Sequence, residues 1–155
     1  ALGRRESARV APGDRLVLAR VGAERIGLAV CYDVRFPAQF VALARRGARA
    51  VLVCASWAPG AGKVHQWRTL VTARAMDCAS FVIAVDQADP GGGGTAPTGV
   101  GHSMVVDPSG EVLLELGTGP GLAVVDVDLD LADVVRARLP VLEDGSSAGT
   151  PTDAP

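Results

Sequence analysis

Short apolar runs alternate with amphipathic stretches over the first half of the chain. The runs at 25–31, 50–55 and 81–86 are apolar at nearly every position, which is typical of strands buried on both faces of a sheet. The stretches 36–46 and 64–78 between them repeat apolar residues at helical spacing and predict two helices. The order strand, helix, strand, helix, strand predicts parallel pairing through right-handed crossovers.

Shorter elements are predicted on either side of this core. Residues 15–20 predict a strand that forms a hairpin with 25–31. After a Gly/Pro-rich loop at 88–101, which we expect to be mobile, the chain predicts an antiparallel meander over 102–107, 111–116 and 122–128 and a helix over 129–138. The predicted fold class is therefore α/β, a mixed sheet with a parallel βαβαβ core followed by an antiparallel meander. We expect one domain over 1–142 and a disordered, low-complexity tail over 143–155.

Composition excludes several classes of protein. A chain of 155 residues with 48% hydrophobic and 21% charged residues can bury a core and does not resemble a disordered chain. The net charge of −2 gives no reason to expect a nucleic-acid or anionic membrane partner, and no apolar run is long enough to span a bilayer. The three cysteines are too widely spaced for a disulfide framework or a CxxC metal site. We therefore expect a cytoplasmic protein.

Cys31 is the first candidate for chemistry. It stands at the C-terminal end of an apolar run, and Tyr-Asp-Val-Arg-Phe-Pro leads from it directly into a predicted helix. Ligands of open α/β sheets collect at the carboxyl ends of strands, and a nucleophile on a strand-to-helix turn lies near helix N–H groups that favour a thiolate and can bind an oxyanion. The alternative is a small buried hydrophobic residue, the role we expect for Cys54 and Cys78.

Of four residues near Cys31 or after the next strand, three admit two interpretations each. Tyr32 supplies the first backbone N–H after the sulfur. Asp33 and Arg35 are either groups of the site or a helix cap and a surface ion pair. Trp57 is either a pocket wall or the edge of the core.

Two further features are weaker candidates. His65 and His102 have no acid partner nearby in the sequence, so structural hydrogen bonding is the expected role for both. The glycines at 91–94 lack the Lys-Ser/Thr pair and the helix of a phosphate-binding loop, so phosphate binding is not expected.

The segment GLAVCYDVRFP (27–37) resembles the nucleophile segment of the nitrilase superfamily of carbon–nitrogen hydrolases, especially its Nit-type amidase branch. The resemblance continues through AVLVCASWAPG, HQWRTLVTARAMD, FVIAVDQ and GHSMVVDPSGEVLLELG, in the family's order and spacing, and it covers nearly all of 6–142. It implies that this chain is the C-terminal half of an αββα four-layer sandwich.

The resemblance also implies a chemistry. Family members hydrolyse amides or nitriles with a Glu–Lys–Cys triad, through a thioester in the case of amides, and use no metal or organic cofactor. Cys31 matches the nucleophile, and Glu6 matches a further glutamate that helps to orient the site. Arg35 matches the position at which carbamoylase-like relatives hold a substrate carboxylate. The expected substrate-binding residues are Tyr32, Arg35, Ser56 and Trp57.

The triad Glu and Lys of the family should precede Glu6, where this chain has only ALGRR, and its one lysine, Lys63, follows the cysteine. The resemblance therefore implies that both groups lie in a segment absent from this chain. The partners we expect are a small amide or nitrile substrate, the N-terminal half of the same domain, and further copies in a homodimer or larger homo-oligomer formed through 36–46 and 129–142. The function we expect is hydrolysis of a small amide of the ω-amide type. The alternative is an inactive nitrilase-like binding or assembly module.

Overall fold

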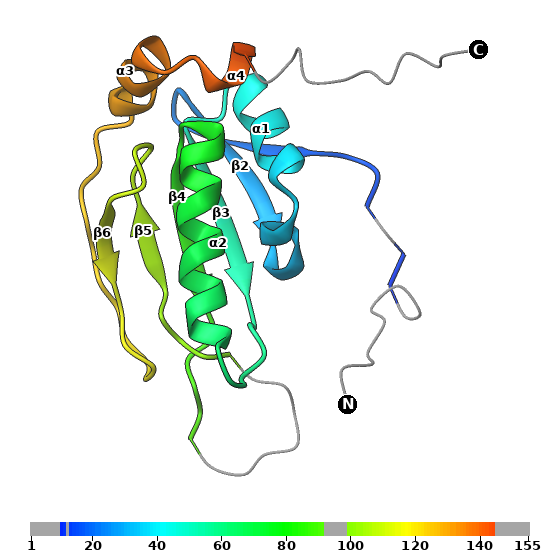
Figure 1. The fold of residues 1–155 in the computed structure, drawn as a ribbon, viewed down its shortest axis with the longest axis vertical. Coiled ribbons are helices and arrows are strands. Elements are labelled where there is room, and N and C mark those ends of the chain that lie inside the picture. The colour runs from blue at the N-terminus through cyan, green and yellow to red at the C-terminus, as the bar shows by residue number, and fades with distance from the viewer. Residues whose placement is uncertain (1–9, 12, 92–98, 145–155) are drawn as a thin grey trace.

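The computed structural model describes residues 10–11, 13–91 and 99–144, which form one six-stranded sheet flanked by helices (Figure 1). The strands are β1 (Val17–Val21), β2 (Glu24–Val30), β3 (Ala50–Ala55), β4 (Phe81–Asp86), β5 (Met104–Val106) and β6 (Val112–Glu115). The helices are the 3-10 helix η2 (Cys31–Arg35), α1 (Pro37–Arg45), α2 (Lys63–Cys78), α3 (Asp130–Arg138) and α4 (Val141–Asp144). None of these described helices combines the length and the apolar character needed to cross a bilayer.

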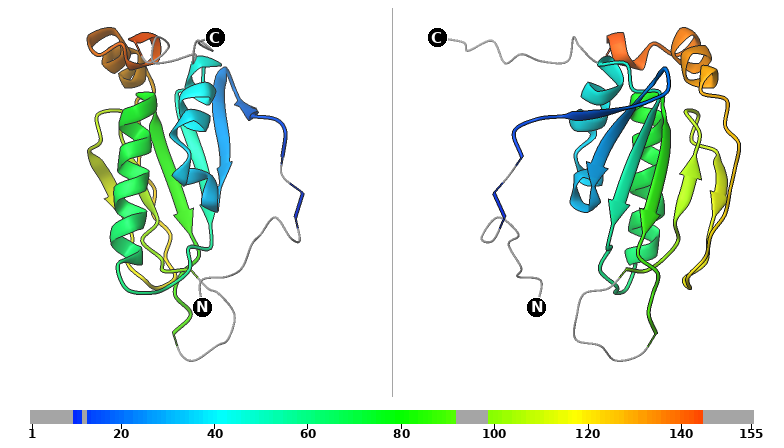
Figure 2. Two further views of the ribbon diagram at one scale, coloured as in Figure 1. Left: turned by 45° about the vertical axis from the view of Figure 1, so that its right-hand side comes forward. Right: turned by 180° about the vertical axis from the view of Figure 1, so that it is seen from behind.

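The sheet has the predicted mixed topology. Strands β2, β3 and β4 are parallel neighbours, while β1 on one side and β5 and β6 on the other pair antiparallel, in the order β1-β2-β3-β4-β5-β6. Helices α1 and α2 are the crossovers between the parallel strands, and both cover the same face (Figure 2). The carboxyl ends of β2, β3 and β4 therefore lie together at one end of the sheet, with Cys31 following β2.

The main core lies between the sheet and these two helices. Phe40 and Leu43 of α1 and Trp67 and Val71 of α2 are fully buried against the sheet. Burying side chains of this size contributes about 1.5–3 kcal/mol each. At Gly27 of β2 an added Cβ would lie 3.1 Å from a methyl carbon of Leu43, so the absence of a side chain lets α1 approach the strand closely.

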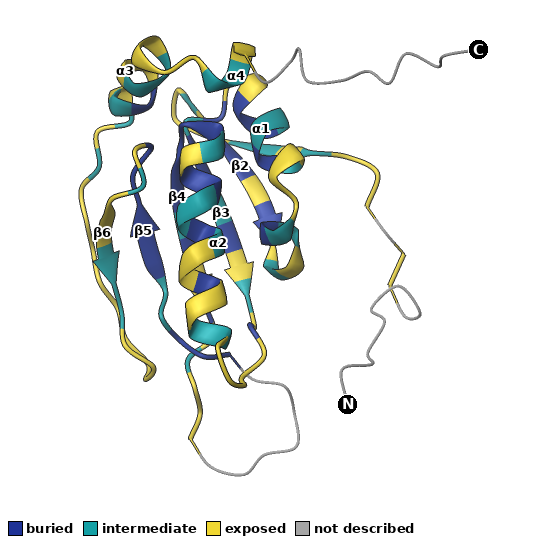
Figure 3. Cartoon of the chain, viewed as in Figure 1, coloured by how far each residue is buried: buried dark blue, intermediate teal, exposed yellow. Residues whose placement is uncertain are grey.

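The other face of the sheet is open at its carboxyl end. Val30, Cys54 and Val85 are register partners on β2, β3 and β4, and all three are exposed, as is Leu28 (Figure 3). The view from behind has no described helix in front of these strands (Figure 2). The prediction that these strands are buried on both faces is therefore wrong for this end, as is the prediction that Cys54 belongs to the core. Strand alternation sends Cys54 to the face away from the helices.

The amino end of the open face is covered. Ile26, Ala50 and Phe81 form a small second core, against which the partly buried Val127, Leu129 and Leu131 pack. Arg49 joins this end to α3 through ion pairs with Glu24, Asp130 and Asp133. Apolar packing and ion pairs therefore stabilise this end of the sheet, which is opposite to the end that carries Cys31.

Some further predictions differ from the structure, and others fall outside the described residues. The stretch 122–128 forms no strand, and Leu122 and Val124 are 93% and 88% exposed. Glu143 and Asp144, predicted as the start of the disordered tail, belong instead to α4. Glu6, most of the glycine loop (92–98) and the rest of the tail (145–155) lie outside the described residues.

Candidate active site

Cys31 lies at the turn between β2 and η2, the position that the sequence predicts. It is a non-glycine residue with a positive φ of 44°, a region that side chains with a Cβ rarely adopt. Its thiol is partly exposed and lies 4.0 Å from the backbone oxygen of Ser56, which follows β3. Strained backbone of this kind clusters at functional sites, so the turn at Cys31 is the centre of the candidate site.

Asp33 holds this turn in place. Its Oδ2 accepts hydrogen bonds from the backbone N–H of Val30, at 2.9 Å, and from Nε2 of Gln39 on α1, at 3.2 Å. The carboxylate therefore caps the turn and ties it to the next helix, which resolves the two interpretations of Asp33 in favour of the cap.

Arg35 and Trp57 are brought together although 22 positions separate them in the sequence. The guanidinium carbon of Arg35 lies 4.8 Å from the centre of the Trp57 ring and 5.7 Å from that of Tyr32, and an Arg35 N–H donates to Oε1 of Gln66 at 3.1 Å. Trp57 is 4% exposed and lies against Trp67, which makes it the edge of the core. Tyr32 is exposed.

Asp86 ties together the loops that follow β3 and β4. Its buried carboxylate accepts hydrogen bonds from the backbone N–H groups of Trp57, at 2.7 Å, and Val100, at 2.8 Å. Burial raises the pKa of Asp86, and these hydrogen bonds oppose that rise. Ser56 precedes Trp57, and its hydroxyl donates to Oε1 of Gln87 at 3.1 Å. Asp86 was not singled out from the sequence, because it ends an apolar strand without any motif around it.

His102 has an acid partner that is close only in space. Its Nδ1 lies 2.7 Å from Oε1 of Glu115 on β6, and Arg68 of α2 also pairs with that carboxylate. Burial would raise the pKa of Glu115, but hydrogen bonds and charge from Arg68 and His102 outweigh it and lower the pKa. This cluster fits the structural role expected for His102, whereas the exposed His65 forms no side-chain hydrogen bond or ion pair with the described residues.

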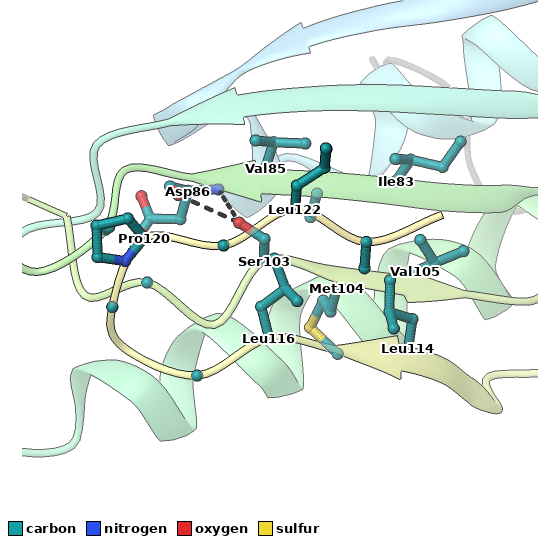
Figure 4. A pocket seen from close by; sticks show the side chains of 17 residues that line it. Ile83, Val85, Asp86, Ser103, Met104, Val105, Leu114, Leu116, Pro120 and Leu122 are labelled. Carbon is teal, nitrogen blue, oxygen red and sulfur yellow. Dashed lines mark hydrogen bonds between the residues drawn. The ribbon is translucent and has the colours of Figure 1, made fainter. Parts of the chain in front are cut away.

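A cavity of about 340 Å³ lies on the open face of the sheet, and Asp86 is part of its lining (Figure 4). It is bounded by apolar side chains of β4, β5 and β6 and by the segment 117–123, including Ile83, Val85, Val105, Leu114 and Leu122. None of the five described site residues predicted from the sequence lines it. The residues gathered near Cys31 are instead Arg35, Ser56 and Trp57, with Tyr32 beside them on η2.

Comparison with known proteins identifies the class to which this fold and this turn belong. The model of the carbon–nitrogen hydrolase family matches residues 1–137. The chain therefore belongs to the carbon–nitrogen hydrolase family, within the nitrilase superfamily.

Relatives and solved structures agree with this assignment. A hydrolase of Mycobacterium tuberculosis is 50% identical over 149 residues, which are 92% of this chain and 53% of that protein. The deaminated glutathione amidase of Escherichia coli O157:H7 is 35% identical over 88% of this chain and 50% of its own length. An amidase of Nesterenkonia sp. AN1 from the nitrilase superfamily, solved with acrylamide added to its active-site cysteine, is 37% identical with a TM-score of 0.69 and covers 89% of this chain and 53% of its own. This chain thus spans about half the length of these relatives.

Proposed function

We propose that this chain is the nucleophile-bearing half of a hydrolase that cleaves small amides of the ω-amide type, with Cys31 as the nucleophile. The observation that carries the proposal is the positive φ of Cys31 at a strand-to-helix turn, with the carboxyl ends of the parallel strands beside it. Two relatives named as amidases, one of them with an adduct on its active-site cysteine, support the same reaction.

The reaction would run in two steps. The Cys31 sulfur bonds to the amide carbon, the carbon–nitrogen bond breaks, and ammonia leaves with the thiol proton. Water then attacks the thioester carbon, the carbon–sulfur bond breaks, and the carboxylic acid leaves as the thiol regains a proton. In this mechanism the backbone N–H of Tyr32, the first after the sulfur, would donate to the oxyanion of each tetrahedral intermediate.

The general base and a cation for the oxyanion must come from outside the described residues. Lys63, the one lysine of the chain, lies over Trp57 with its Nζ 5.3 Å from the ring centre. It also follows the cysteine, so it does not match the family lysine in chain order. The alternative, an inactive binding or assembly module, predicts that no Glu and Lys at family spacing are encoded upstream of Ala1.

The same proposal assigns a partner to the open face of the sheet. We propose that the N-terminal half of the same domain packs on this face, where Val30, Cys54 and Val85 form an apolar row. Apolar surface of this kind is stabilised by removal from water, and the lengths of the relatives leave room for a second sheet.

We further propose that the complete protein is a cytoplasmic homodimer or larger homo-oligomer, joined through α1 and the segment 129–142. A two-fold interface would use the same patches on both subunits. Sedimentation of a clean monomer at micromolar concentration would contradict this assembly.

The decisive experiment is Cys31→Ala in the full-length protein that contains this chain. We expect ammonia release from ω-amides to be abolished while the melting transition and the far-UV spectrum are retained. Cys54→Ala is the matched control, because it removes a thiol from the next strand, and it should keep most of the activity. Turnover by the Cys31→Ala variant would refute the mechanism.

A further inference from the structure

The backbone of His102 contacts the pair of aromatic rings beside Cys31. Its backbone oxygen accepts the indole N–H of Trp67 at 2.9 Å. The Trp67 ring lies 5.5 Å, centre to centre, from the Trp57 ring, and the guanidinium carbon of Arg35 lies 4.8 Å from the centre of the Trp57 ring. A continuous series of contacts therefore runs from His102 through two tryptophan rings to residues that we expect to bind the substrate.

The direction of this backbone oxygen depends on an unusual conformation. His102 has a positive φ of 56°, which residues with a Cβ rarely adopt. Its backbone N–H donates to the backbone oxygen of Gly117, in the segment after β6, at 3.0 Å. Because a conformation of this kind persists only where surrounding contacts hold it, the contacts of the His102 side chain become important.

The imidazole of His102 is anchored to a carboxylate of β6. Nδ1 of His102 lies 2.7 Å from Oε1 of Glu115, and the His102 side chain is 15% exposed. A carboxylate only accepts hydrogen bonds, and an unprotonated Nδ1 would be repelled at this distance, so Nδ1 carries the proton and donates it. Nε of Arg68 donates to the same carboxylate oxygen at 2.8 Å, which fixes the acceptor from the side of α2.

Three consecutive residues of α2 connect this anchor to the candidate site. Gln66 accepts a hydrogen bond from Arg35 at 3.1 Å. Trp67 donates to the backbone oxygen of His102, and Arg68 pairs with the carboxylate that holds the imidazole. A shift of this helical turn would displace the acceptor of Arg35 and the packed tryptophan ring together, whereas the turn that carries the thiol has its own cap.

We propose that His102 is a positioning residue: bonded to Glu115, it holds the Trp67–Trp57 pair and Arg35 in the arrangement that binds the substrate. It acts through these rings and not by contact with the substrate, so its loss weakens binding and leaves the chemical step at the thiol largely unchanged. This role rests on the proposed hydrolysis of amides by the nucleophile of the chain.

Two variants of the full-length protein separate the imidazole from the backbone conformation. Glycine adopts a left-handed φ without strain, so His102→Gly removes the hydrogen bond to Glu115 and adds no strain. His102→Asn keeps a donor, because its side-chain nitrogen is as many bonds from Cα as Nδ1 is, and asparagine also tolerates this φ.

The expected result is a change in KM and not in kcat. With the ω-amide glutaramate as substrate, His102→Gly should raise KM about 10-fold, the size of one lost hydrogen bond, and change kcat by less than about 3-fold. His102→Asn should stay within about 3-fold of the wild type in both constants.

His65→Asn is the matched control. His65 also belongs to α2, but it is exposed and forms no side-chain hydrogen bond or ion pair with the described residues, so both constants should stay unchanged. A purely structural role of His102 predicts another result, because partial unfolding lowers the concentration of active enzyme, so that kcat falls while KM stays constant. That result would overturn the proposal, as would an asparagine variant as impaired as the glycine variant.

A second measurement needs no turnover. In the Cys31→Ala background, calorimetry measures the Kd of glutaramate, which His102→Gly should raise about 10-fold. A raised Kd in a protein whose wild type hydrolyses no amide contradicts the proposed function alone. Hydrolysis of amides with KM and Kd unchanged in the glycine variant contradicts the role of His102 alone.

Discussion

At the scale of single residues, Cys31 adopts a left-handed backbone conformation that is rare for a residue with a Cβ. A φ of 44° brings the Cβ of an L residue close to its following carbonyl, which costs about 1–2 kcal/mol in this region. A glycine at position 31 would avoid this cost, and the chain keeps a side chain there. If Cys31 is the nucleophile, as proposed above, this conformation presents its thiol at the end of β2.

This strain predicts a difference between two variants that both lack the thiol. Cys31→Gly should be more stable than Cys31→Ala by about 1 kcal/mol, because alanine keeps the Cβ that the left-handed conformation disfavours. Denaturant unfolding of the two full-length variants measures the difference, and both should be equally inactive. Equal stability, or a more stable alanine variant, would mean that the turn relaxes in the absence of the thiol.

Cys78 is the structural counterpart of Cys31. It is fully buried on α2, as the sequence predicts, and burial raises the pKa of its thiol to about 11 from an ordinary value of 9.0. Because the folded pKa is the higher one, the stabilisation it reflects is present below pH 9.0 and is lost as the pH rises through about 11. The Cys78 thiol therefore stays protonated in the folded chain at neutral pH, where burial also shields it from reagents.

At the scale of elements, the site depends on loops that one carboxylate holds together. Asp86 ends β4 and accepts N–H groups from the loop after β3 and from the segment before β5, at Trp57 and Val100. The strands alone would bring these loops to one end of the sheet without setting the position of the Trp57 ring. Arg35 of η2 and Lys63 of α2 both contact that ring.

Asp86→Asn should therefore loosen two loops at once. The amide has one oxygen to accept hydrogen bonds and turns its NH₂ toward an N–H donor, so we expect a loss of about 1–3 kcal/mol in the free energy of unfolding. Burial raises the folded pKa of Asp86 above that of the unfolded chain, so its contribution to stability is present below the unfolded pKa and falls as the pH rises through the folded pKa. This part of the pH dependence should disappear in the variant.

Asp89→Asn is the control for this prediction. Asp89 is exposed on the same loop and accepts one N–H, from Gly91, which asparagine can still accept. Unfolding in denaturant at two pH values measures both variants. Equal small losses of stability in the two variants would contradict the anchoring role of Asp86.

At the scale of the whole molecule, the sheet is covered on one face and open over much of the other. Helices α1 and α2 bury one side, while Val30, Cys54 and Val85 are exposed on the opposite side together with the apolar segment 122–125. This asymmetry is expected of one half of a two-sheet sandwich, and the chain spans about half the length of its relatives.

The reactivity of Cys54 tests whether a second sheet covers the open face in the full-length protein. In the native full-length protein we expect Cys54 to resist iodoacetamide because the second sheet shields it, while Cys31 reacts and activity falls in proportion. Both should react after denaturation. Mass spectrometry of the alkylated peptides measures each thiol separately, and reaction of native Cys54 at the rate of a free thiol would contradict packing on this face.

Hydrophobic periodicity was sufficient to predict most elements. Both long helices were predicted to within one residue at each end, and the parallel order of β2, β3 and β4 followed from their alternation with helices. The turn at Cys31 was also predictable, since a strand that ends in Cys-Tyr-Asp before a proline-led helix leaves little other arrangement. These features depend on residues that are close together in the sequence, so they can be predicted from the sequence pattern alone.

The sequence by itself thus determined the elements, their order and the position of Cys31, because period and turn chemistry are local. Only the tertiary structure decided which face each apolar strand residue occupies. Cys54 and the segment 122–125 have the composition of core strands and are exposed, because burial depends on what lies opposite. It also decided the pairings across the chain, such as Asp86 with Trp57 and His102 with Glu115. Those contacts arise where separate loops and strands meet, and no spacing along the chain encodes them.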